Sequence, residues 1–151
     1  MSLKTLSYIS IIIVCLLSSC TTSKTTVSKN ADLEKYKYAS IINNDTYHIP
    51  AELMEYEILL FDAIKSSRLE LVSDWRIHEL QTKQQNELLL VKYGITQTDG
   101  GAIVTVNFID YMTGRPVASC RGAFGLGITH SMDLKGAIKR AEKQISDTFP
   151  K

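Results

Sequence analysis

Few side chains of this 151-residue chain have the chemistry of a catalytic or metal-binding group, and their spacing fits neither role. The histidines are His48, His78 and His130, and none lies in an HExxH pattern, which places two imidazoles on one helix face for zinc. His78 and Glu79 are adjacent, so on a helix they would point apart. No serine lies in a GxSxG turn. We therefore predict no metal, no cofactor and no enzymatic activity.

A glycine-spaced segment, Gly122–Gly127, leads from an expected strand into an expected helix, where a phosphate could meet the helix N-terminus. Its glycines do not follow GxGxxG, and no GK[ST] sequence comes after them. The preceding strand also belongs to an antiparallel arrangement and not to a βαβ unit. A sharp turn packed closely against the sheet explains these glycines better than a nucleotide site does.

The cysteines lie in different settings. Cys15 belongs to an apolar run over residues 8–17, which follows Lys4 and precedes two serines. This run is about ten residues long, whereas a membrane span needs roughly 20, so we predict a secretory signal over residues 1–19 and not a buried strand or a membrane helix. Cys120 has no cysteine left to pair with and lies in an expected strand. We expect a buried apolar thiol there, with a reactive or intermolecularly paired thiol as the alternative.

The segment Leu17–Cys20 resembles the lipobox of bacterial lipoproteins, with Leu, two small residues and the acceptor cysteine in order. The resemblance implies cleavage before Cys20, a diacylglycerol on its sulfur and an acylated amine. Two or more acyl chains hold a protein stably on a bilayer. The resemblance also implies that Thr21, in place of an aspartate, favours the outer membrane. Because no acidic run follows Cys20, we expect a lipid-anchored domain that faces the periplasm.

Charge and composition limit what the rest of the chain can do. Lys4 is the only charged side chain of the signal, so the chain from residue 20 carries 16 basic and 16 acidic residues. This balance argues against a polyanion binder, and we expect no nucleic-acid partner. Residues 20–31 are rich in Thr, Ser and Lys without apolar periodicity, which predicts a flexible tether. Residues 32–151 then form one domain that can bury a core without disulfides.

Periodicity predicts the elements of this domain. Strands are expected over residues 35–42, 68–72, 88–95, 102–110 and 117–124, of which the last three form an antiparallel meander. One helix is expected from Pro50 and another from a cap at Ser131 or Asp133. The apolar stripe of the first helix comprises Leu53, Met54, Ile58, Leu60, Phe61 and Ile64. The stripe of the second comprises Leu134, Ile138, Ala141, Ile145 and Phe149. Residues 73–87 show no clear pattern.

The resulting order, β-α-β-x-β-β-β-α, predicts an α+β fold. It is a two-layer sandwich in which two helices cover one face of a mostly antiparallel mixed sheet. The other face is then open to solvent. Alternation along the strands places on it Lys92, Thr105, Asn107, Ser119 and Arg121, which Tyr36 and Tyr38 of the first strand could join. A polar, mildly basic face with tyrosines suits a protein partner, a second copy of the chain or glycan strands.

The strand LLLVKYG, the hairpin DYMTGRPVASCRGAFG and the last helix resemble small bacterial lipoproteins over residues 33–149. The matching positions are Val91, Tyr93, Gly94, Thr113, Gly114, Val117 and Ser119. More distantly, the order of elements is similar to envelope adaptor domains, such as the N-terminal domain of the Tol translocation protein and lipoprotein activators of peptidoglycan synthases. These resemblances imply docking without catalytic residues. We therefore expect a non-enzymatic envelope adaptor with an envelope protein as its partner, and the alternative is a lipoprotein that binds glycan or cell-wall fragments.

Overall fold

The structure is a computed structural model that describes residues 23–42 and 54–151. The predicted signal, the predicted lipidation site at Cys20, His48 and the predicted helix start at Pro50 lie outside the described residues. Within residues 23–42 and 54–151, no helix has the length and apolar content needed to cross a bilayer.

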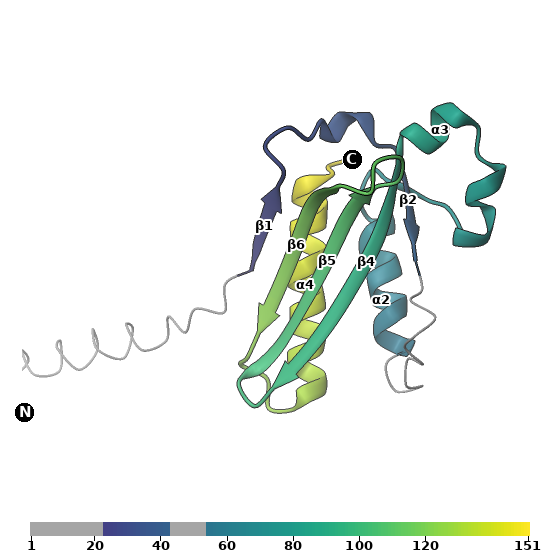
Figure 1. Ribbon diagram of the computed structural model, residues 1–151. Coiled ribbons are helices and arrows are strands. Elements are labelled where there is room, and N and C mark those ends of the chain that lie inside the picture. Colours follow the sequence, from purple (N-terminus) through teal and green to yellow (C-terminus); the bar gives the residue numbers. More distant parts are fainter. Residues whose placement is uncertain (1–22, 43–53) are drawn as a thin grey trace, which may run out of the picture.

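The described chain forms the predicted α+β fold, with a six-stranded mixed sheet in the order β1-β6-β5-β4-β2-β3. The strands are β1 (Lys24–Val27), β2 (Tyr38–Ile41), β3 (Glu70–Leu71), β4 (Leu88–Thr98), β5 (Gly101–Asp110) and β6 (Pro116–Phe124). Strands β4, β5 and β6 form the predicted antiparallel meander, whereas β2 runs parallel to both β3 and β4. Helices α2 (Met54–Lys65) and α4 (His130–Thr148) lie on one side of this sheet (Figure 1).

The core lies between the sheet and α4. The predicted stripe of this helix is confirmed, since all five of its members are buried. The rings of Phe149 and Phe108 of β5 are tilted by 57° with centroids 4.8 Å apart, a favourable geometry for an aromatic pair. Gly122 of β6 faces the backbone of α4 at Ala137 and Ala141, where any side chain would collide. The glycine therefore sets how closely helix and sheet approach.

Helix α4 begins earlier than predicted, because its cap is Thr129 and not Ser131 or Asp133. The Thr129 hydroxyl accepts a hydrogen bond from the Met132 N–H at 3.3 Å. Asp133 serves the preceding connection instead, where its Oδ1 accepts the Gly127 N–H at 2.6 Å.

The apolar stripe predicted for the first helix is wrong in part: Leu60 and Ile64 are buried as predicted, and Leu53 lies outside the described residues. Helix α2 buries Tyr56, Leu60, Ala63 and Ile64, whereas Met54, Ile58 and Phe61 are exposed. The helix has apolar residues on more than one side, so periodicity alone does not select the packed side. The side that packs contains the small residue Ala63, which permits close approach to the core.

The flexible tether predicted over residues 20–31 differs from the structure at Lys24–Val27, which form strand β1. This strand extends the sheet beside β6, with Lys24 opposite Arg121 and Val27 opposite Ala118. The 3-10 helix η1 (Leu33–Lys35) follows. Because η1 occupies these residues, β2 begins at Tyr38 and not at Lys35.

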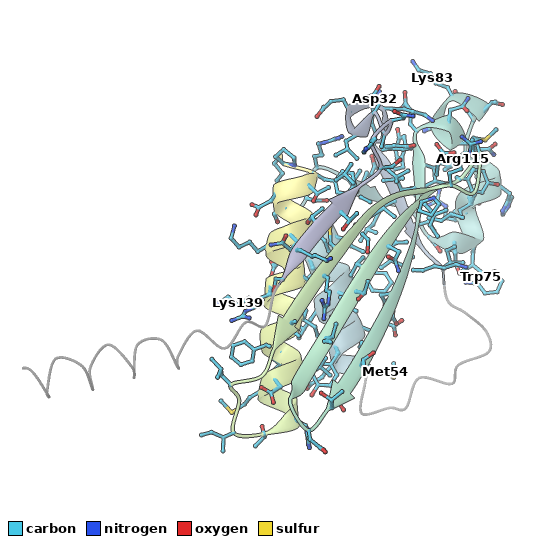
Figure 2. The ribbon with its side chains drawn as sticks, turned by 60° about the vertical axis from the view of Figure 1, so that its left-hand side comes forward. Asp32, Met54, Trp75, Lys83, Arg115 and Lys139 are labelled. Atoms are coloured by element: carbon cyan, nitrogen blue, oxygen red, sulfur yellow. The ribbon has the colours of Figure 1, made fainter. Side chains whose placement is uncertain are left out.

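The stretch over residues 73–87 forms an excursion between β3 and β4. It consists of the 3-10 helix η3 (Asp74–Glu79) and the short helix α3 (Thr82–Asn86). Trp75 points outward from this excursion and is 82% exposed (Figure 2). Helix α3 lies at the end of the molecule opposite to the β4–β5 hairpin (Figure 1).

Candidate functional site: the open face of the sheet

The sheet face turned away from α2 and α4 brings together the five polar residues that alternation predicted. One row across β4, β5, β6 and β1 is Lys92, Asn107, Ser119 and Thr26. The next row is Gly94, Thr105, Arg121 and Lys24. With strands about 4.8 Å apart, each row spans roughly 15 Å. We call these eight residues the open basic face.

The charge of this face has one sign. Lys24 and Lys92 are exposed and Arg121 is half-buried. Strands β1, β4, β5 and β6 contain a single acidic residue, Asp110, which pairs with Leu89 and is buried on the covered side. Within the described part of the chain, Lys24, Lys92 and Arg121 form no ion pair. Their charges are therefore available to an acidic partner.

The middle of the open basic face consists of short polar side chains and a glycine. The Ser119 hydroxyl donates to Asn107 Oδ1 at 2.7 Å, which fixes both side chains. No atom lies within 4 Å of the position that a Cβ would take at Gly94. The backbone of β4 is thus uncovered between Lys92 and Thr96. Cations, amides and hydroxyls around bare backbone are suited to hydrogen bonding and charge pairing, and not to acid–base chemistry.

Tyr36 does not join the open basic face, which corrects the prediction from alternation. The alternation does not extend back to Tyr36, because β2 begins two residues later. The side chain is 5% exposed, and its hydroxyl donates to Asp110 Oδ2 at 2.7 Å. Burial and this bond to Asp110 raise the pKa of Tyr36 above its ordinary range. Tyr36 is therefore a structural residue.

Asp110 is the centre of a buried polar cluster at the end of β5. Its Oδ2 also accepts from Lys35 Nζ at 2.9 Å, and its Oδ1 accepts from the Thr113 N–H at 2.8 Å and the Thr113 hydroxyl at 3.0 Å. Burial acts to raise the pKa of Asp110, but the hydrogen bonds from Lys35, Tyr36 and Thr113 outweigh it and hold the pKa well below its usual range. The cluster ties η1 to the β5–β6 turn.

Tyr38 also lies apart from the open basic face. It pairs with Leu88 at the start of β4, four residues before Lys92. It is half-buried, and Gln84 Nε2 of α3 donates to its hydroxyl at 3.5 Å. Tyr38 therefore lies beside α3 at the start of β4, away from the cationic rows.

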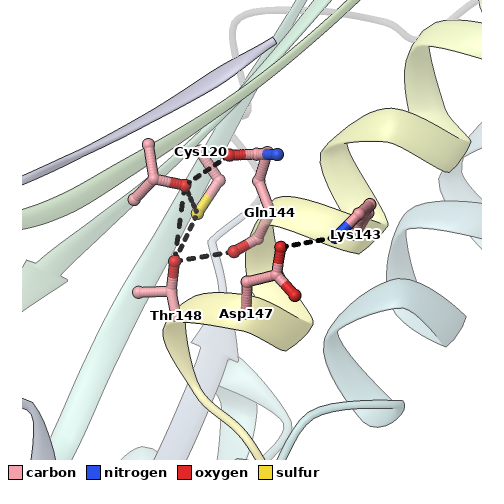
Figure 3. Close-up of polar contacts among 6 residues, drawn as sticks. Cys120, Lys143, Gln144, Asp147 and Thr148 are labelled. Carbon is pink, nitrogen blue, oxygen red and sulfur yellow. Dashed lines mark hydrogen bonds and ion pairs between the residues drawn. The ribbon is translucent and has the colours of Figure 1, made fainter.

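Cys120 is buried on the covered side of β6, as predicted. Its sulfur lies 3.7 Å from Thr25 Oγ1 of β1 and 3.6 Å from Thr148 Oγ1 of α4 (Figure 3). Burial raises the pKa of the Cys120 thiol, although the hydrogen bonds from Thr148 and Thr25 oppose this effect. Thr25 also donates to Gln144 Oε1 at 3.0 Å, so β1 is joined to α4 across this thiol.

The described histidines are not part of the open basic face. His78 is exposed in η3, and His130 is the exposed first residue of α4. In the described residues, no three His, Cys, Asp or Glu side chains are grouped so that they could hold a metal ion.

A groove of about 540 Å³ lies between α2 and α4, on the far side of the molecule from the open basic face. Glu55 and Lys135 cross it as an ion pair of 3.1 Å, and both side chains are about half exposed. Leu59 and Ile138 form part of its lining. The groove is lined by charges of both signs, of which Glu55 and Lys135 pair with each other, whereas the open basic face carries cations alone.

Three members of the open basic face were not predicted from the sequence, namely Gly94 of β4 and Lys24 and Thr26 of β1. The composition of residues 21–30 suggested a tether, yet the run Thr25-Thr26-Val27 consists of β-branched residues, which favour strands. Its alternation, with Lys24 and Thr26 on one face and Thr25 on the other, is the signal that could have identified β1.

No protein-family model matches this sequence, and no curated protein matches it. Among solved structures, the PelC dodecamer from Paraburkholderia phytofirmans is similar at 16% identity and a TM-score of 0.46, over 86% of this chain and 98% of that one. A single-residue variant of that dodecamer is similar at 17% identity and a TM-score of 0.44, over 85% and 98% of the two chains. Likeness at this level carries no argument about function, which rests here on the residues of this chain.

Proposed function

We propose that this chain is a lipid-anchored, non-enzymatic adaptor of the bacterial envelope, which docks an acidic surface of a partner protein on its open basic face. The observation that carries the proposal is the charge of that face. Three cations from three different strands lie on it without an acidic neighbour in those strands. Charge complementarity of this kind steers association and selects partners.

The position of the tyrosines favours a protein partner over a glycan. Tyr36 is buried and Tyr38 lies beside α3, so neither adds an aromatic surface to the cationic rows. Small-ligand sites are also concave and largely apolar, whereas this face is an open sheet surface with polar side chains. Extended polar surfaces of this type are suited to a protein surface of matching charge.

Crosslinking in the cell tests the docking surface. A photoreactive residue at position 105, in the centre of the open basic face, should capture an envelope protein with an acidic surface. The same residue at position 83, on α3, should not. Capture should be lost when Lys24, Lys92 and Arg121 are all replaced by glutamine.

A matched control removes the same number of charges elsewhere, at Lys29, Lys83 and Lys151, and should leave capture intact. Raising the ionic strength should weaken capture as well, since exposed charges are screened beyond about 10 Å at 0.1 M salt. Equal capture from positions 105 and 83, or capture that both triple variants retain, would show that the open basic face is not the docking surface.

The anchor is tested separately by Cys20→Ala. This variant should lose incorporation of a labelled fatty acid and should leave the membrane fraction, because the proposed acylation site is gone. Cys120→Ala is the control and should keep both properties. A Cys20→Ala protein that is still fatty-acid labelled and membrane-bound would refute lipid attachment at this residue.

A further inference from the structure

Three apolar side chains are exposed together at the end of the molecule where β6 passes into α4. Leu126 and Ile128 belong to the connection and Met132 to the first turn of the helix. Ile128 is 92% exposed, more than any other large apolar residue in the described chain. Single exposed apolar residues are common on protein surfaces, but an adjacent group of them marks a contact site. We call these three residues the apolar tip.

The connection that carries the apolar tip is held in place by hydrogen bonds and close packing. The Gly127 N–H donates to the buried carboxylate of Asp133 at 2.6 Å. Thr129 caps α4, and the backbone of Gly125 lies directly against that of Gly100 in the β4–β5 hairpin. The outward position of Ile128 therefore results from a fixed backbone and not from fraying of a helix end.

The N-terminal end of β1 faces the same end of the sheet, because β1 is antiparallel to β6. Ser23 precedes β1, and its hydroxyl accepts the N–H of Ala123 at 3.2 Å, one residue before β6 ends. The predicted acylation site, Cys20, is three residues before Ser23. At no more than about 3.6 Å per residue, this segment reaches roughly 11 Å. An acylated Cys20 would therefore enter the bilayer within roughly 11 Å of Ser23, which lies at the end of β1 nearer the apolar tip because β6 runs antiparallel to β1 and leads to that tip (Figure 1).

We propose that the apolar tip inserts into the interfacial region of the bilayer that holds the acylated Cys20. The inference rests on the lipid anchor of the proposed function, and the short reach of residues 20–22 identifies the occupant as membrane lipid. Two attachment points fix the orientation of the domain. The meander strands then run away from the membrane, and the open basic face is presented sideways to a partner in the same compartment.

Fluorescence quenching on vesicles tests the proposal. The acylated full chain with Ile128→Cys carries an environment-sensitive fluorophore, and the matched chain carries it at Lys83→Cys, at the opposite end of the molecule (Figure 2). Cys120 is buried and does not compete for the label under native conditions. Vesicles of phosphatidylethanolamine and phosphatidylglycerol contain a lipid with a nitroxide near its headgroup.

Quenching should be several-fold stronger at position 128 than at position 83. Replacing Leu126 and Met132 by glutamine should reduce the quenching at position 128 without changing the melting temperature, because both side chains are exposed. If the protein floats with the vesicles but the two probes are quenched equally, the anchor stands and tip insertion is refuted. If the protein does not float with the vesicles, the anchor and the tip proposal are both refuted.

Discussion

Asp110→Asn is the substitution that tests how the N-terminal segment is held to the sheet. The change keeps the shape of the side chain but replaces an acceptor oxygen by an amide nitrogen. In the native cluster, Oδ2 faces the donors Lys35 and Tyr36, and Oδ1 faces Thr113. The asparagine can keep its oxygen toward Thr113, but its NH2 group then meets two donors on the other side.

The expected loss of stability follows from the burial of each partner. The Lys35 side chain is 39% exposed, so its ion pair contributes no more than about 1 kcal/mol. The Tyr36 hydroxyl is buried, and leaving it without an acceptor costs about 1–3 kcal/mol. Asp110→Asn should therefore lower the free energy of unfolding by about 1–4 kcal/mol. This loss corresponds to a decrease of the melting temperature on the order of 10 °C.

The pH dependence identifies the carboxylate as the cause. The folded-state pKa of Asp110 is depressed, so its stabilisation is present above its unfolded pKa of about 4 and is lost as the pH falls toward the folded value. Urea unfolding of both proteins should give a constant difference between about pH 5 and pH 8. The difference should decrease steadily on further acidification, because the wild-type carboxylate becomes protonated.

Asp74→Asn is the matched control, since Asp74 lies in η3 and its carboxylate bonds only to neighbouring residues of the same segment. It should change stability by less than about 0.5 kcal/mol. A loss below about 0.5 kcal/mol for Asp110→Asn as well, or a difference that stays the same from pH 7 to pH 2, would refute the role assigned to the cluster.

Three further predictions concern the packing of the helices. Gly122→Ala should lower the free energy of unfolding by at least about 1–3 kcal/mol, because the new methyl group meets the backbone of α4. Gly94→Ala adds a methyl group in open space and should be tolerated. Equal urea midpoints for the two variants would contradict the close approach of α4 to Gly122. Ile64→Ala should cost about 2–5 kcal/mol and Ile58→Ala less than about 0.5 kcal/mol, and similar losses for the two variants in thermal unfolding would return Ile58 to the packed stripe expected from the sequence. Native Cys120 should resist a thiol reagent at neutral pH and react once the chain is unfolded, since the thiol is buried and burial raises its pKa. Rapid reaction of the folded protein would contradict the burial of Cys120.

The meander and the last helix could be predicted because the spacing of their apolar residues fits only one assignment of buried and exposed faces. Strand β5 alternates strictly, with Val104, Val106 and Phe108 buried and Thr105 and Asn107 between them partly exposed. A one-residue slip would reverse both faces of such a strand, so its register is strongly determined. This is why five of the six residues of the open basic face in β4, β5 and β6, all except Gly94, could be predicted correctly from alternation alone.

The remaining elements depend on contacts that are remote in sequence. Strand β1 is stabilised by β6, about a hundred residues away, and its local composition resembles that of a linker. The packed side of α2 is selected by its fit to α4 and the sheet, since apolar residues occur around more than one side of the helix. Tyr36 is turned inward by η1 and by its bond to Asp110, which lies 74 residues further on.

The position of β1 determines how the domain carries mechanical load. In the proposed anchored state, force transmitted through the lipid anchor enters at Ser23 and acts along β1. Antiparallel hydrogen bonds lie perpendicular to their strands, so such a pull shears all the bonds to β6 together and does not open them one at a time. The bond from Thr25 to Gln144 passes part of this force directly into α4. The anchored end of the domain therefore resists a pull along β1, although β1 is only four residues long.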